Sequence, residues 1–264
     1  MSERGTTAGD LSPEVRDALH RLIIALADGK RLMGIRYSDW VLGAPSIETG
    51  IAASSMAQDE WGHARLLYAM LKDFDVDPVV VEHERPAERY CSPEALDQPF
   101  DDWAEVVAGC VVVDGAVSSG LRAFAAGSYE GARSRVPKML AEEEFHWDMA
   151  AAWYRRLARA SDDARTRLRD STLRMLPSTL AWMAPGDAAA ARLADAGLTD
   201  DPVAIRSNFE AVVGPVLSEL EIDVTVVVPS GEGWDESRGR GPGGPDEEAV
   251  ERARGDRNRM LFVE

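Results

Sequence analysis

The chain has 264 residues, of which 45% are hydrophobic and 28% charged, so it can bury one substantial core. Its 46 acidic residues outnumber 29 basic ones, and the net charge of −17 argues against nucleic acid or an anionic membrane as a partner. The 2 cysteines are too few for a disulfide framework or a Cys-based metal site. There is no apolar signal segment near the N-terminus and no run of about 18 apolar residues, so we expect a soluble, cytoplasmic protein.

The first part of the chain predicts a helical hairpin. Ser12 is a favourable N-cap and Pro13 a favourable first helical residue, after which apolar residues recur at helical spacing to about Trp40. A short break follows, and a second helix is predicted from Ser46 to about residue 73. Because the break is short, the two helices are expected to lie antiparallel.

A second hairpin is predicted after a proline-rich connection. Residues 75–99 contain four prolines among charges and are predicted to form a loop. Residues 101–127 are apolar and too numerous for one strand, so they are predicted as a buried helix, with residues 130–160 as the next. Two hairpins with a longer link between them are the layout of an all-α four-helix bundle.

The rest of the chain predicts additional C-terminal helices near 162–185 and 202–221. We therefore expect one helical domain over residues 11–225. The glycine-rich stretch 229–245 has the composition of a flexible linker. Residues 226–264 are accordingly predicted to form this linker and a short C-terminal segment with one charged helix.

Two Glu-x-x-His motifs carry the strongest chemical signal. Glu60 and His63 lie on the predicted second helix, and Glu143 and His146 on the fourth. Residues three apart share a helix face, so each pair can offer a carboxylate oxygen and an imidazole nitrogen to a common ion. A bundle with this motif on two helices and a carboxylate on each of the other two is the ferritin-like di-metal arrangement, which binds iron or manganese. Alternatively, both histidines are partly buried residues that pair with acids.

The third predicted helix supplies Asp114, an acid within an apolar segment. Burying its charge without compensation costs on the order of several kcal/mol, and a divalent cation is one efficient way to compensate it. Arg122, two turns further on, offers a structural salt bridge as the alternative. On the first helix a complete site needs one more carboxylate, and the nearest acids are Asp28 and Asp39.

Several segments together resemble the phenylacetic acid catabolic proteins, the PaaA and PaaC subunits of the phenylacetyl-CoA epoxidase. The similarity covers roughly residues 15–225. The matching segments are Tyr37-Ser38-Asp39-Trp40, Ala44-Pro45, Ala57-Gln58-Asp59-Glu60, Gly62-His63-Ala64-Arg65-Leu66-Leu67-Tyr68, Val113-Asp114-Gly115-Ala116 and Glu143-Glu144-Phe145-His146. The resemblance implies metal ligands at Glu60, His63, Asp114, Glu143 and His146.

The first helix departs from the catalytic pattern. Counting back from Glu60 without gaps, Lys30 stands where the catalytic subunit PaaA has its helix-one Glu. A lysine cannot replace a bridging carboxylate, and this helix is more similar to that of PaaC, which pairs with PaaA and supports it. We expect the Lys30 ammonium to form an ion pair with Asp114 or Glu60 in place of a metal ion.

The resemblance implies a place in aerobic phenylacetate catabolism. If the site is intact, the chain is an oxygenase component, a di-iron monooxygenase that receives electrons from a separate flavin and iron–sulfur reductase and acts on phenylacetyl-CoA. Two iron ions are expected in that case, and one or none if the site is degenerate. The alternatives are a non-catalytic scaffold that holds a catalytic paralogue in a hetero-oligomer, and an unrelated ferritin-like di-metal oxidase.

Overall fold

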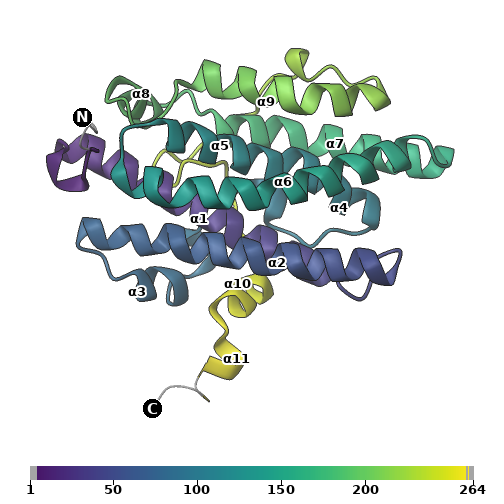
Figure 1. Ribbon diagram of the computed structural model, residues 1–264, viewed down its shortest axis with the longest axis horizontal. Coiled ribbons are helices and arrows are strands. Elements are labelled where there is room, and N and C mark those ends of the chain that lie inside the picture. The colour runs from purple at the N-terminus through teal and green to yellow at the C-terminus, as the bar shows by residue number, and fades with distance from the viewer. Residues whose placement is uncertain (1–4, 260, 262–264) are drawn as a thin grey trace.

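The computed structural model describes residues 5–259 and 261, and within this part of the chain it contains helices and no strands (Figure 1). The expected all-α class is therefore confirmed. The bundle consists of α1 (Pro13–Asp39), α2 (Ile47–Tyr68), a composite third helix and α6 (Glu130–Ala158). Helices α1 and α2 form one layer of the molecule, and α6 lies above α2 in the view of Figure 1.

The first hairpin forms where its capping residues predict it. The Ser12 side chain accepts a hydrogen bond from the Val15 amide at 3.4 Å, and the Ser46 side chain accepts one from the Thr49 amide at 3.2 Å. These bonds satisfy amide groups that have no partner inside the helix. The second helix is α-helical to Tyr68 and then continues as a 3₁₀ helix, Ala69–Phe74.

The third helix is one continuous apolar rod with a wider turn in its middle. It comprises α4 (Trp103–Gly109), a π-helical turn (Cys110–Asp114) and α5 (Gly115–Ala126). Residues 103–126 are long and apolar enough to cross a membrane, but 94% of an apolar 18-residue part of this stretch is buried inside the protein, as in the core helix of a bundle. A π-helical turn often marks a functional position in a helix, and this one ends at Asp114.

The connection 75–99 is more ordered than the predicted loop. It contains α3 (Pro78–His83) and two 3₁₀ turns, Ala87–Arg89 and Glu94–Leu96. The prediction of a plain loop was wrong for α3, because a proline at the first position of a helix loses no intrahelical hydrogen bond. The Asp77 side chain caps this helix by accepting from the Val79 amide at 2.9 Å.

The C-terminal helices cover the other side of the third helix. These are α7 (Asp162–Met183), α8 (Ala188–Asp195) and α9 (Pro202–Leu217), whereas α10 (Glu247–Arg254) and α11 (Asp256–Arg259) follow the glycine-rich stretch and lie below the α1–α2 layer (Figure 1). Within that stretch Arg240 is buried and lies 2.6 Å from Asp97. The stretch therefore packs on the bundle in this structure, and the domain division at residue 225 stays a prediction.

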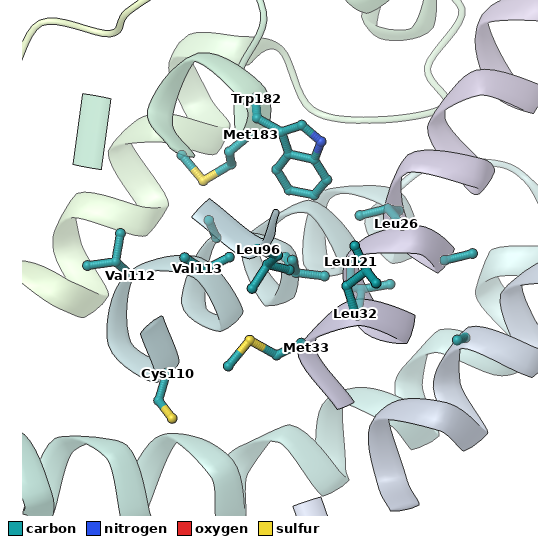
Figure 2. Close-up of a cluster of buried hydrophobic side chains, with 14 of the residues drawn as sticks. Leu26, Leu32, Met33, Leu96, Cys110, Val112, Val113, Leu121, Trp182 and Met183 are labelled. Carbon is teal, nitrogen blue, oxygen red and sulfur yellow. The ribbon is translucent and has the colours of Figure 1, made fainter. Parts of the chain in front are cut away.

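The hydrophobic core lies between α1, the third helix and α7. Figure 2 shows part of it, in which side chains of these helices and of the connection meet in one cluster. The labelled members are Leu26, Leu32, Met33, Leu96, Cys110, Val112, Val113, Leu121, Trp182 and Met183. The Trp182 indole also donates a hydrogen bond to the Cys91 carbonyl at 2.8 Å, which fixes α7 to the connection.

Candidate metal centre

Four helices of the bundle send one charged side chain each to a single buried point. The Lys30 ammonium of α1 lies 2.9 Å from Glu60 Oε1 of α2, 2.7 Å from Asp114 Oδ1 of the third helix and 2.6 Å from Glu143 Oε1 of α6. All four side chains are buried. The expected ion pair of Lys30 with Asp114 or Glu60 is therefore present with both partners, and Glu143 is a third.

The two histidines connect α2 and α6 across this centre. His63 Nδ1 lies 3.0 Å from Glu143 Oε1, and His146 Nδ1 lies 3.1 Å from Glu60 Oε1. Each imidazole therefore faces the carboxylate of the other Glu-x-x-His motif. Both Nδ1 atoms are buried and lie within ion-pair distance, but neither is aligned for a hydrogen bond.

The outward nitrogens of the same histidines contact a second pair of acids. His63 Nε2 lies 2.7 Å from Glu142 Oε2, and His146 Nε2 lies 3.4 Å from Asp59 Oδ2. These acids immediately precede Glu143 and Glu60. Neither acid was predicted to have a role, although an acid directly before each Glu-x-x-His motif was a visible signal.

Two hydroxyl groups hold the buried carboxylates from behind. The Tyr37 hydroxyl donates to Asp114 Oδ2 at 2.7 Å, and the Ser118 hydroxyl donates to Glu143 Oε2 at 2.7 Å. Hydrogen bonds of this kind orient a carboxylate and satisfy the oxygen that the ion pair leaves free. Tyr37 was named from sequence only as part of a family-like segment and was given no role, and Ser118 was missed, because a serine on an apolar helix carries no distinctive pattern.

The charges of the cluster shift the pKa values of its members. Burial alone would lower the pKa of Lys30, but the three surrounding carboxylates outweigh it and hold that pKa well above its usual range. Burial acts to raise the pKa of Asp114, yet Lys30 and His146 hold it well below its usual range. Burial and Asp114 together raise the pKa of Glu60 to about 8. Burial lowers the pKa of His146, but Asp114 and Glu60 outweigh it and raise that pKa to about 11.

The acids nearest on the first helix do not join the centre. Asp28 is buried, and its carboxylate lies 3.0 Å from Arg85 Nη1 and accepts hydrogen bonds from the Tyr68 hydroxyl at 2.5 Å and the Cys91 amide at 2.7 Å. Asp39, at the last turn of α1, lies 2.5 Å from an Arg252 nitrogen. The first helix therefore contributes an ammonium and no carboxylate to the centre.

The predicted ligands come together, but a cation of the protein lies among them. Ligand atoms of Glu60, Asp114, Glu143 and His146 all lie within 4.8 Å of one another, and His63 lies beside Glu143. Three carboxylates and an imidazole form a donor set that could bind a divalent metal ion. In this arrangement, however, the Lys30 ammonium is within 2.9 Å of three of these donors. A metal ion would have to displace it, so the residues as arranged do not fit a di-metal centre.

Comparison with known proteins identifies the family of the chain and agrees with its fold. No curated protein matches the chain. The family model described as phenylacetic acid catabolic protein, which spans the PaaA and PaaC types, matches residues 5–241. This range includes all four helices of the bundle and the whole buried centre. The chain belongs to the phenylacetic acid catabolic protein family, and its bundle is the ferritin-like bundle of that family.

Proposed function

We propose that this chain is a PaaC-type, non-catalytic subunit of a phenylacetyl-CoA epoxidase, which binds a metal-containing paralogue and supports it. One observation carries the proposal: the Lys30 ammonium lies within 2.9 Å of three buried carboxylates. By the family resemblance, the catalytic type has a glutamate ligand at this place. Lys30 replaces that ligand, and its charge also compensates the acids that a metal ion would compensate.

The assignment implies that two chains with the same fold have different roles in the complex. The catalytic paralogue supplies the iron ions and the oxygen chemistry, and the present chain supplies a folded surface against which it is held. Phenylacetyl-CoA and the flavin and iron–sulfur reductase then act on the paralogue. The complex belongs in the cytoplasm, where reduced cofactors are available to such a reductase.

A second candidate is an oxygenase component with its own iron. It is favoured by buried donor atoms that lack an aligned hydrogen bond, namely Nδ1 of His63, Nδ1 of His146 and Oε2 of Glu60. These atoms would become ligands if Lys30 turned away, and iron bound there would activate dioxygen. An unrelated ferritin-like di-metal oxidase would also need Lys30 to turn away from the donor atoms. It would differ in that it does not require phenylacetyl-CoA.

Metal analysis combined with reconstitution tests the proposal. The chain is purified alone, incubated anaerobically with ferrous iron and desalted, and its iron content is compared with that of the PaaA-type chain of the same organism. We expect iron in stoichiometric amount only in the PaaA-type chain, and oxidation of phenylacetyl-CoA only when that chain and a reductase are present. Two iron ions in the present chain, with phenylacetyl-CoA oxidation by it and a reductase alone, would establish the second candidate.

A further inference from the structure

A small apolar cavity lies beside the N-terminal half of α1, away from the buried charged centre. Helices α5, α7, α8 and α9 form the rest of its wall, and its volume is about 70 Å³. The large side chains around it include Leu22, Trp182, Leu193 and Ile205. Spaces larger than a water molecule are few in a closely packed domain, and an apolar cavity is the usual form of a small-molecule site.

Small residues on three different helices leave this space. Ala25 of α1, Gly120 of α5 and Ala190 of α8 all line the cavity. A larger side chain at Ala25 or Ala190 would extend into it. The cavity is therefore formed within packed helices, which hold its shape better than surface loops would.

A wider cleft of about 690 Å³ adjoins the apolar cavity on the outer side of α1. Ala18 and Arg21 line both spaces. The Arg21 guanidinium is held in place, because its Nη1 lies 2.8 Å from Asp187 Oδ2 and its Nη2 donates to Asp187 Oδ1 at 2.9 Å. One ligand can therefore occupy both spaces if its apolar end lies in the cavity and its polar end lies beside Arg21.

The outer cleft offers hydrogen-bond donors to such a polar end. Five arginines line it, namely Arg21, Arg85, Arg89, Arg192 and Arg238. Arg89 and Arg192 are exposed, and neither guanidinium forms a hydrogen bond or ion pair with another described residue. His20 also lines the cleft, and its buried Nε2 atom has no hydrogen-bond partner among the described residues. An acidic group would accept from these donors.

The charge balance of the cleft favours a head group with a single negative charge. Three acids line the cleft beside the five arginines, namely Glu14, Asp17 and Glu236. In addition, Arg21, Arg85 and Arg238 already have carboxylate partners in ion pairs. Little positive charge is left without compensation, so a carboxylate suits the cleft better than a phosphate with up to about two charges.

The volume of the cavity favours a short aliphatic chain over an aromatic ring. An apolar cavity known to bind benzene measures about 150 Å³, which is roughly twice the volume here. A water molecule takes up about 30 Å³ in the liquid. The 70 Å³ of this cavity therefore hold about two or three carbon atoms, as in the chain of a short fatty acid.

We propose that the cavity and the adjoining cleft bind a short-chain aliphatic carboxylate, with butyrate as the representative size. Its hydrocarbon chain lies among Leu22, Ala25 and Trp182, and its carboxylate lies beside Arg21, on the side of Arg89 and Arg192. This site does not depend on the proposed function. It shares no residue with the Lys30 centre, and the ligand is neither aromatic nor a thioester.

A ligand series tests the chemistry of the site. The full chain is titrated with butyrate, acetate, benzoate and 1-butanol, and binding is followed by ligand-observed NMR. We expect a Kd for butyrate on the order of 1 mM, as is usual for so small a molecule. Acetate lacks two methylene groups and should bind about tenfold more weakly. Benzoate that binds as tightly as butyrate would overturn the aliphatic assignment, and equally tight 1-butanol would overturn the role of the arginines.

Substitutions in the cavity and the cleft test its position. Ala25→Leu and the smaller change Ala190→Val fill the cavity from two helices, and each should weaken butyrate binding by at least about fivefold. The double variant Arg89→Gln with Arg192→Gln should weaken it to a similar extent. Melting temperatures show whether each variant is folded. Ala152→Leu on α6 and Arg65→Gln on α2 are matched controls, because both residues are exposed and lie outside the two spaces.

The outcomes separate this site from the proposed function. Unchanged butyrate binding in folded Ala25→Leu and Ala190→Val would show that the cavity is not the site. An equal loss of binding in the two control variants would point to unspecific attraction and would also overturn it. Wild-type protein that binds none of the four probes would overturn the proposal, and it would leave the assignment as a PaaC-type subunit standing.

Discussion

The Lys30 ammonium and the Glu143 carboxylate lie 2.6 Å apart in the buried interior and join the first and fourth helices of the bundle. In a di-metal protein of this fold, the ion connects the helices in that way. In this chain the Lys30 side chain connects the helices instead, with a single positive charge. A buried ion pair adds little net stability over a well-packed apolar core, but losing one of its members is costly.

Replacing Lys30 by methionine is therefore expected to destabilise the protein strongly. The apolar side chain has a similar length, so the change removes the charge with little change in packing. Glu60, Asp114 and Glu143 are then buried together without their cation. We expect a loss of about 3–5 kcal/mol in the free energy of unfolding, measured by urea denaturation at neutral pH.

Lys72→Met is the matched control, because Lys72 is exposed. Its effect should stay within about 0.5 kcal/mol, the usual range for a surface substitution. If Lys30→Met costs no more than this control, the ammonium does not compensate the three carboxylates in solution.

Asp28→Asn tests the second buried ion pair of the first helix. Asp28 accepts from Arg85, Tyr68 and the Cys91 amide, so the amide leaves a buried guanidinium without its counter-charge. We expect a loss of about 3–5 kcal/mol in the free energy of unfolding, with no change in metal content. In a double-mutant cycle with Arg85→Gln, the double variant should lose less stability than the sum of the two single losses, because the two residues interact. A change in metal content without a loss of stability would instead indicate that Asp28 is a ligand.

The helices and the histidine motifs were predictable from local signals. Apolar periodicity and the Ser12 and Ser46 caps place α1 and α2, because a helix is determined mainly by residues within a few positions of each other. The two Glu-x-x-His motifs were found for the same reason, since i and i+3 share a face in any helix. Helix α3 was missed because prolines were taken to prevent a helix that Pro78 in fact begins.

The partners of the buried groups were harder to predict from sequence. Asp28 pairs with Arg85, which is 57 residues away, and no local pattern connects the two. The position of Lys30 was expected through the family resemblance, which aligns it with a ligand. Its contact with Glu143 was not expected, because sequence spacing does not show how far a lysine side chain reaches across a bundle.

The lowered pKa of His20 leads us to expect a loss of stability on mild acidification. Its ring packs beside Phe74, with ring centroids 5.5 Å apart, and burial lowers the pKa of His20 below its ordinary value of 6.5. The unfolded chain then binds a proton more readily than the folded chain, so the contribution of His20 to stability is lost as the pH falls below that value. Urea denaturation of wild type and His20→Leu between about pH 7.5 and pH 5 checks this. The wild type should lose more stability than the variant over this interval, and equal losses would contradict the shift.

Lys30→Glu is expected to convert the centre into a metal site. The variant adds the missing helix-one carboxylate beside Glu60, Asp114 and Glu143, and it removes the cation that repels a metal ion by roughly 4 kcal/mol per unit charge pair at about 4 Å and an effective dielectric near 20. Without metal the variant should be less stable than wild type, because four acids then face one another. Ferrous iron should restore stability by about 2.7 kcal/mol at a free concentration of 100 times its Kd, with iron content rising from near zero to one or two ions per chain. Lys30→Met controls for loss of the cation alone and should bind iron more weakly than Lys30→Glu. Wild-type protein that already holds two iron ions, with no gain in Lys30→Glu, would mean that Lys30 turns away in solution and that the sixth ligand comes from elsewhere.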